Sequence, residues 1–299
     1  MIQRERVADN VYSFQSDVYA QVTAGAVIGP NWAVVIDTLA MPEETLAIRD
    51  FLEQDLSVPV RYVINTHYHA DHAWGTYFFP GATVIGHSLC RIWLEEKGIA
   101  SLENSRKQSQ VFRNVKIILP QITFDDGQLS LRVGKKNLVL VPLPGHSADN
   151  IAVLVEEDRV LFSGDVCMPL PYIVDGNIDE MVVSLKKVAK MGLENIIQGH
   201  GDIVLRGEID GYIKENLNYL SQIRKAVRKA NRRKYPMDIL EEVTVESCGK
   251  SRVLIGGLSE QLHRRNLIAL YKQLFGEIPL ASGDDDEDYY DYEDEEDEE

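Results

Sequence analysis

The sequence predicts an α/β fold in which two sheets form the core and helices lie outside them. Three observations lead to this prediction. Short runs rich in Val and Ile alternate with turns and amphipathic helical patterns over residues 11–197. Polar residues next to glycine repeatedly follow these runs, and from Tyr212 onward the pattern becomes helical. A βα rhythm interrupted by hairpins is typical of a two-sheet core.

The first half of the chain is predicted to contain four strands and one helix. Residues 11–14, 21–23, 33–37 and 60–65 have the β-favouring composition of strands. Residues 42–54 carry apolar side chains at a helical spacing behind a proline, which suits the first position of a helix.

The second half is predicted to alternate strands with longer helices. The strands lie at residues 115–119, 129–133, 138–141, 151–155, 160–163 and 196–197. Helices are expected over 181–190, from Tyr212 onward and over 260–275. One face of the Tyr212 helix is apolar and the opposite face is basic. We interpret the basic face as solvated, with docking of an acidic C-terminal segment as the alternative.

The acidity of the chain is concentrated at its C-terminus. The net charge is −16, from 47 acidic and 31 basic residues, yet residues 284–299 contain 13 acidic residues and no basic one. Without that segment 34 acidic residues remain against 31 basic ones, a net charge of −3. Such a body lacks the basic surface expected for nucleic-acid binding. We therefore expect a small-molecule substrate, no nucleic-acid or membrane partner, and no particular oligomeric state.

Other sequence features point to an ordinary globular protein. No stretch approaches the roughly 20 apolar residues of a membrane-spanning helix. The first six residues lack the apolar core of a secretory signal, so a cytoplasmic location is expected. Cys90, Cys167 and Cys248 have no CxxC spacing and are interpreted as buried, reduced thiols. His87 is interpreted as a structural histidine and His263 as a surface-helix residue.

Three imidazoles and one carboxylate lie within six residues, directly after the predicted strand 60–65. They are His67, His69, Asp71 and His72. Imidazole nitrogen and carboxylate oxygen suit zinc and other first-row divalent ions. In extended backbone His67 and His69 point to one side and can bind one ion. Asp71 and His72 are adjacent and must diverge, which offers them to a second ion.

Three further ligand-type residues follow predicted strands and have glycine neighbours. They are His146 in Pro-Gly-His-Ser, Asp165 in Ser-Gly-Asp and His200 in Gly-His-Gly. Glycine permits the tight backbone paths that direct a side chain into a shared cleft. Seven ligands exceed what one tetrahedral ion uses, so the sequence predicts a two-metal cluster.

The motif His67-x-His69-x-Asp71-His72, followed by Gly-His, Ser-Gly-Asp and a second Gly-His, resembles the metallo-β-lactamase superfamily. The resemblance covers roughly residues 5–230, and its ligand set is closest to the glyoxalase II-like and lactonase-like pattern of an uncharacterised branch. It implies an αββα four-layer sandwich with metals at the sheet edges. It also implies a catalytic domain over 1–230 and a C-terminal helical extension over 231–280. The acidic residues 281–299 are predicted to be disordered.

The same resemblance implies a role for each ligand. The first metal would be held by His67, His69 and His146, the second by Asp71, His72 and His200, and Asp165 would bridge the two.

The expected function is a dinuclear zinc hydrolase with two Zn²⁺ per chain; iron or manganese are the alternative metals. A metal-bridging hydroxide would attack a small ester, thioester, lactone or amide. Asp71 could also orient the nucleophile and move its proton. Tyr172, in a proline-rich loop after Asp165, is a second candidate catalytic residue, as donor to the transition-state oxyanion. A packing role in that loop is the alternative.

Two other functions remain open at this point. A mononuclear iron persulfide dioxygenase resembles the same pattern and belongs to a different reaction class. A non-catalytic, ligand-binding relative is also conceivable, although no ligand position is degraded. Metal analysis separates the first two, because hydrolysis predicts two zinc ions and oxygenation one iron.

Overall fold

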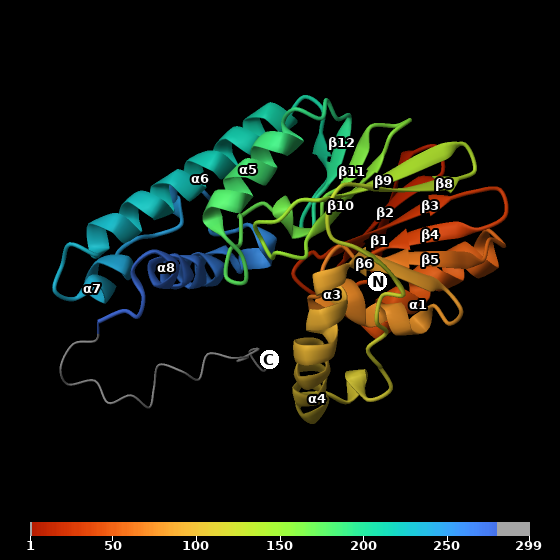
Figure 1. Ribbon diagram of the computed structural model, residues 1–299, viewed down its shortest axis with the longest axis horizontal. Coiled ribbons are helices and arrows are strands. Elements are labelled where there is room, and N and C mark those ends of the chain that lie inside the picture. The colour runs from red at the N-terminus through yellow and green to blue at the C-terminus, as the bar shows by residue number, and fades with distance from the viewer. Residues whose placement is uncertain (1, 280–299) are drawn as a thin grey trace.

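Within residues 2–279, which the computed structural model describes, two sheets lie face to face with helices on their outer sides (Figure 1). The expected αββα four-layer sandwich is thereby confirmed. None of the helices in this range is long and apolar enough to cross a bilayer. The predicted disordered segment 281–299 lies outside the described residues.

The first sheet contains seven strands of the described chain in sequential order. They are β1 (Ile2–Ala8), β2 (Val11–Ser16), β3 (Thr23–Ile28), β4 (Ala33–Ile36), β5 (Val60–Ile64), β6 (Thr83–His87) and β7 (Ile122–Phe124). Strands β1 to β4 pair antiparallel, whereas β4 to β7 pair parallel. The parallel half brings the carboxyl ends of β4 and β5 to the same edge of the sheet.

The second sheet contains six described strands in the order β13-β12-β11-β10-β9-β8. They are β8 (Leu129–Val133), β9 (Lys136–Pro142), β10 (Ile151–Val155), β11 (Val160–Phe162), β12 (Asn195–Ile197) and β13 (Val204–Leu205). All neighbours pair antiparallel except β11 and β12, which are parallel. The carboxyl ends of β11 and β12 therefore also meet at one edge.

Aliphatic side chains from both sheets form the core between them. Ile36 and Ile64 of the first sheet belong to one cluster with Leu138, Leu140 and Val153 of the second. Each is at most 1% exposed. Burying such a side chain contributes about 1.5–3 kcal/mol, so this layer holds the two sheets at a fixed separation.

Helices on the first sheet and beside the site are short. They are α1 (Pro42–Asp50) with a π-helical turn (Phe51–Asp55), α2 (Ala70–Ala73) with a 3₁₀ turn (Trp74–Phe78), α3 (Ser88–Trp93) with a π-helical turn (Leu94–Gly98), and α4 (Ile99–Gln108) with a 3₁₀ turn (Gln110–Phe112). Ile48 of α1 packs in one cluster with Val35 and Val63 of the sheet. Pro42 occupies the start of α1, as predicted, where its missing N–H costs nothing.

The outer face of the second sheet is covered by two longer helices, α5 (Ile178–Val188) and α6 (Ile209–Ala230) (Figure 1). They are followed by α7 (Pro236–Leu240) and α8 (Ser259–Phe275), which contact α6. This half of the described chain also has 3₁₀ turns at Gly164–Val166, Glu246–Cys248 and Ile255–Gly257. Ile213 of α6 and Leu267 of α8 share a cluster with Leu161 and Ile196 of the sheet. The boundary at residue 230 between domain and extension stays a prediction.

Two sequence interpretations are wrong. Residues 115–119 form no strand; β7 begins at Ile122, and Val115 is buried against Trp74 and Leu102 instead. His263 is not a surface residue: it is fully buried. Its Nε2 donates to the Val243 carbonyl at 3.1 Å, so its Nδ1 accepts from the Tyr219 hydroxyl at 2.9 Å. This face of α8 packs on α6, which the helical pattern alone does not reveal.

The interpretations of His87 and of the cysteines agree with the structure. His87 is structural: its Nδ1 accepts from the Leu89 N–H at the start of α3 and its Nε2 donates to the Asp125 carbonyl. The three cysteines are buried and unpaired. Of the strand predicted at 21–23, only Thr23 lies in a strand, at the start of β3.

Candidate metal centre

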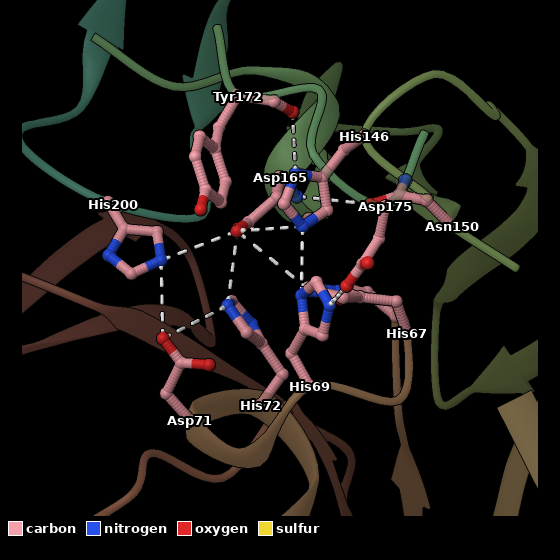
Figure 2. A network of polar contacts seen from close by, with 12 residues as sticks. His67, His69, Asp71, His72, His146, Asn150, Asp165, Tyr172, Asp175 and His200 are labelled. Atoms are coloured by element: carbon pink, nitrogen blue, oxygen red, sulfur yellow. Dashed lines mark hydrogen bonds and ion pairs between the residues drawn. The ribbon is translucent and has the colours of Figure 1, made fainter. Parts of the chain in front are cut away.

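The seven ligand-type residues converge at the edge where β5, β9, β11 and β12 end (Figure 2). His67 and His69 follow β5, Asp71 and His72 lie in α2, His146 follows β9, Asp165 lies in the 3₁₀ turn after β11, and His200 follows β12. Backbone hydrogen bonds join the two sheets beside this edge: Thr23 N–H donates to the Gly199 carbonyl at 2.8 Å and Gly201 N–H to the Gln21 carbonyl at 2.9 Å. Residues from both sheets are thereby fixed relative to one another.

Four of these residues form a first group, made of His67, His69, His146 and Asp165. One ligand atom of each lies within 4.8 Å of the others. His69 Nδ1 is 3.0 Å from His67 Nε2 and 2.9 Å from His146 Nε2, and His146 Nε2 is 3.4 Å from Asp165 Oδ2.

The remaining three, Asp71, His72 and His200, form a second group under the same criterion. His200 Nε2 lies 3.3 Å from Asp71 Oδ2 and 3.4 Å from Asp165 Oδ2. His72 Nε2 lies 3.2 Å from Asp165 Oδ1. The Asp165 carboxylate therefore stands between the two groups, within reach of histidines from both.

Each of the five histidines uses its other ring nitrogen to contact the protein. The contacts are His67 Nδ1 to Thr66 Oγ1 at 3.0 Å, His69 Nε2 to Asp175 Oδ2 at 2.8 Å, His72 Nδ1 to Asp37 Oδ2 at 2.9 Å, His146 Nδ1 to the Tyr172 carbonyl at 2.9 Å and His200 Nδ1 to the Ala20 carbonyl at 2.9 Å. Carbonyl and carboxylate oxygens only accept, so these ring nitrogens donate. Thr66 Oγ1 already donates to Asp37 Oδ2, so it too accepts from His67.

This proton arrangement leaves the inward-facing nitrogens with lone pairs. In the first group, His69 Nδ1 lies 3.0 Å from His67 Nε2 and 2.9 Å from His146 Nε2, and no proton lies between these nitrogens when the imidazoles are neutral. In the second, His72 Nε2 and Asp165 Oδ1 are buried and lack a hydrogen-bond partner among residues 2–279. Lone pairs and a carboxylate facing one another need a cation, and their nitrogen and oxygen donors suit a first-row divalent ion. The residues present therefore fit a metal at each group.

The electrostatics of His67, His146 and Asp165 favour metal-binding protonation states. Burial lowers the pKa of His146 to about 4 and that of His67 well below its usual value. Burial raises the pKa of Asp165, but the imidazoles of His72, His200 and His146 lower it by more. The pKa of Asp165 therefore lies well below its usual value. Neutral imidazoles and an ionised carboxylate are the forms that bind metal. Burial lowers the pKa of His69 too, but the carboxylates around it, above all Asp175, raise that pKa by more. Nearby carboxylates likewise raise the pKa of His72 and of His200.

Glycine is required beside two of the ligands. A Cβ at Gly199 would lie 1.8 Å from Asp165 Oδ1, and Gly164 has φ +54° with a Cβ position 2.8 Å from Thr66 Oγ1. Larger residues would push the His200 and Asp165 loops apart. The expected function of these glycines is confirmed at both positions.

Sequence reasoning missed two acidic residues at the site. Asp37 follows β4, has φ 55°, and accepts from Thr66 N–H at 2.8 Å as well as from His72. Its place as the last residue of the predicted strand 33–37 was a usable signal. Asp175 accepts from His69 and from the Tyr68 hydroxyl, each at 2.8 Å. Asp175 is 106 residues from His69 in the chain, so no motif spacing could reveal it.

The Tyr172 ring lies beside the cluster, with its centroid 6.0 Å from that of His146 (Figure 2). Burial raises the pKa of its hydroxyl, and the nearby Arg265 guanidinium lowers that pKa by less. The hydroxyl is therefore protonated at neutral pH and able to donate a hydrogen bond.

Comparisons with known proteins agree with this geometry. Residues 19–214 match the family model of the metallo-beta-lactamase superfamily. The chain is 25% identical over 190 residues to the beta-lactamase-like protein 2 homolog of Caenorhabditis elegans, covering 63% of this chain and 58% of that protein. It is 25% identical over 249 residues to the acyl-coenzyme A thioesterase MBLAC2 of Bos taurus, covering 72% and 86%. The chain thus spans less than two thirds of the nematode relative's length.

A solved structure supports the fold assignment. The metallo-beta-lactamase from Pontibacter korlensis superposes with a TM-score of 0.61 at 19% sequence identity, covering 74% of this chain and 99% of that one. At this identity the likeness shows the fold alone. The family model, however, spans well over half of the 299 residues. The chain belongs to the metallo-beta-lactamase superfamily.

Proposed function

We propose that this protein is a dinuclear zinc hydrolase acting on a small thioester, ester, lactone or amide, with a thioester as the favoured substrate. The observation that carries the proposal is the position of Asp165, within 4 Å of His67 and His146 on one side and of His72 and His200 on the other. One carboxylate within reach of two ligand groups is an arrangement that suits a two-metal site.

In this proposal His67, His69 and His146 hold one ion, Asp71, His72 and His200 hold the other, and Asp165 serves both. When bound, a pair of divalent ions lowers the pKa of water toward neutrality and polarises a carbonyl oxygen. The outward hydrogen bonds of the five histidines keep their rings oriented, so the site needs little reorganisation on binding.

Asp71 is proposed to hold and move the proton of the attacking water. Its side chain is 13% exposed, whereas that of Asp165 is 4% exposed. Asp71 is thus the carboxylate that a water molecule or substrate can reach. The protonated Tyr172 hydroxyl is proposed to donate to the oxyanion that develops during attack.

A thioester is favoured for two reasons. The bovine relative, matched over 86% of its length, is named an acyl-coenzyme A thioesterase. A thiolate is also a good leaving group, because an ordinary thiol has a pKa near 8.5 and needs no strong general acid to depart.

The experiment is metal analysis of the purified full-length protein together with a substrate panel. We expect close to two zinc ions per chain and hydrolysis of acyl thioesters that is lost on chelation and restored by zinc. The panel includes chromogenic esters, lactones and β-lactams as comparison substrates. A single iron per chain, with oxygen consumption in the presence of a persulfide, would replace this proposal by the dioxygenase alternative. The second ligand group stands against that outcome, because one ion would leave its three residues unused.

A further inference from the structure

Asn266 of α8 is fully buried, and its carboxamide contacts the backbone on both sides of Tyr172. Its Oδ1 accepts from the Ile173 N–H at 2.9 Å, and its Nδ2 donates to the Pro171 carbonyl at 2.7 Å. A third contact runs from Nδ2 to the Tyr219 hydroxyl at 3.0 Å. Both amide protons and the amide oxygen are therefore engaged.

The peptide unit between Tyr172 and Ile173 connects this amide to the metal centre. Its N–H is held by Asn266, and its carbonyl accepts from His146 Nδ1 at 2.9 Å. The two groups share one plane and point in opposite directions, because a trans peptide is rigid and planar. Fixing the N–H therefore fixes the direction of the carbonyl that orients His146.

The same contacts also affect the basicity of the His146 ring. A carbonyl whose own amide N–H is hydrogen bonded becomes a better acceptor, because consecutive hydrogen bonds polarise one another. A stronger acceptor at Nδ1 raises the basicity of Nε2, the nitrogen that faces the ligand group. Asn266 is thus linked to His146 by two hydrogen bonds and one peptide plane.

We propose that Asn266 is a positioning residue for His146, and that α8 therefore belongs functionally to the metal centre. The proposal rests on the proposed function only in taking His146 as a metal ligand. No substrate is needed to test it, since the property at stake is zinc affinity.

The first measurement is zinc affinity of the full chain, by competition with a chromophoric chelator, in Asn266→Ala and Tyr219→Phe. Removing a partner outside the ligand set commonly lowers metal affinity 10- to 100-fold. We expect a loss of about tenfold for Asn266→Ala, at the low end because the contact is indirect. Tyr219→Phe removes the third contact of the same amide but leaves both contacts to residues 171 and 173. Its zinc affinity should stay within about twofold of wild type.

Asn266→Asp keeps the oxygen that accepts from the Ile173 N–H but loses the Nδ2 donor to the Pro171 carbonyl. Because the proposal runs through the Ile173 N–H, this variant should retain more zinc affinity than Asn266→Ala. Circular dichroism and thermal melting of the metal-free proteins report folding separately from metal binding.

A double-mutant cycle with His146→Ala decides whether the effect passes through His146. In the His146→Ala background, Asn266→Ala should change zinc affinity less than about twofold. An equal loss in both backgrounds, or a lower melting temperature with unchanged zinc affinity, would overturn the proposal and leave Asn266 a packing residue. A wild-type protein that binds no zinc would overturn this proposal and the proposed function together. Zinc binding without hydrolysis of the panel would overturn the proposed function alone.

Discussion

The Nε2 atom of His72 lies 3.2 Å from Oδ1 of Asp165, and neither atom has a hydrogen-bond partner in the described chain, residues 2–279. A buried polar atom without a partner costs about 1–3 kcal/mol. In the proposed site this cost is offset by metal binding. In the proposed site the pair therefore gains a partner when the metal binds.

Replacing Asp165 should separate the two ligand groups. We expect Asp165→Asn to keep the fold but to bind the second zinc ion at least tenfold more weakly, and to lose nearly all turnover, because an amide compensates less positive charge. Elemental analysis and initial rates measure both effects. Asp202→Asn, an exposed carboxylate in the His200 loop, is the matched control and should behave like wild type. Near-wild-type turnover of Asp165→Asn would show that Asp165 does not serve both groups.

Asp37 offers a test of the contacts around the ligands. Asparagine tolerates its φ of 55°, so Asp37→Asn changes charge with little backbone strain. The variant should lose about 10- to 100-fold in zinc affinity, since it weakens the acceptor for His72 Nδ1. Asp9→Asn, an exposed carboxylate on the β1–β2 turn, serves as the control. Unchanged zinc affinity would mean that Asp37 only supports the Thr66 backbone.

The residues of the two candidate metal groups could be predicted from sequence because their signal is local. Four of them fall within six residues, and the other three each have a glycine beside them at a strand end. The structure explains the glycine at Gly199, where any side chain would collide with Asp165.

The outer contacts could not be predicted in the same way. Asp175 contacts His69 from 106 residues away in the chain. The Tyr172 carbonyl contacts His146 from 26 residues away. Both residues belong to a loop without regular spacing. The false strand at 115–119 has a related cause. An apolar run indicates that its side chains are buried. It forms a strand only where a neighbouring strand offers unpaired backbone N–H and C=O groups. Here those side chains pack beside α2 and α4.

Tyr172 contacts the site in two ways that one substitution can separate. Its carbonyl holds His146, whereas its hydroxyl is the proposed oxyanion donor. Tyr172→Phe keeps the carbonyl, so zinc content should be unchanged while kcat falls about 10²-fold. Tyr62→Phe, in the first sheet and away from the ligand residues, is the control. Loss of zinc from Tyr172→Phe would mean that the ring matters for assembly of the site, and an unchanged kcat would exclude the donor role.

His263 predicts how stability depends on pH away from the metal centre. Burial lowers its pKa below the usual 6.5, while the Val243 carbonyl, Glu260 and Glu246 raise it by less. The native state therefore favours the neutral ring. Its stabilising contribution is complete above pH 6.5 and is lost as the pH falls through the folded-state pKa, because the unfolded chain then binds more protons.

His263→Gln should therefore melt at a lower temperature than wild type at pH 7.5, since losing a buried hydrogen bond costs about 1 kcal/mol. Between pH 7.5 and 5.5, however, its melting temperature should fall by fewer degrees than that of wild type. Comparing the two proteins cancels the titration of the ligand histidines, which they share. Parallel melting curves for wild type and His263→Gln across this range would show that His263 does not stay neutral in the folded protein.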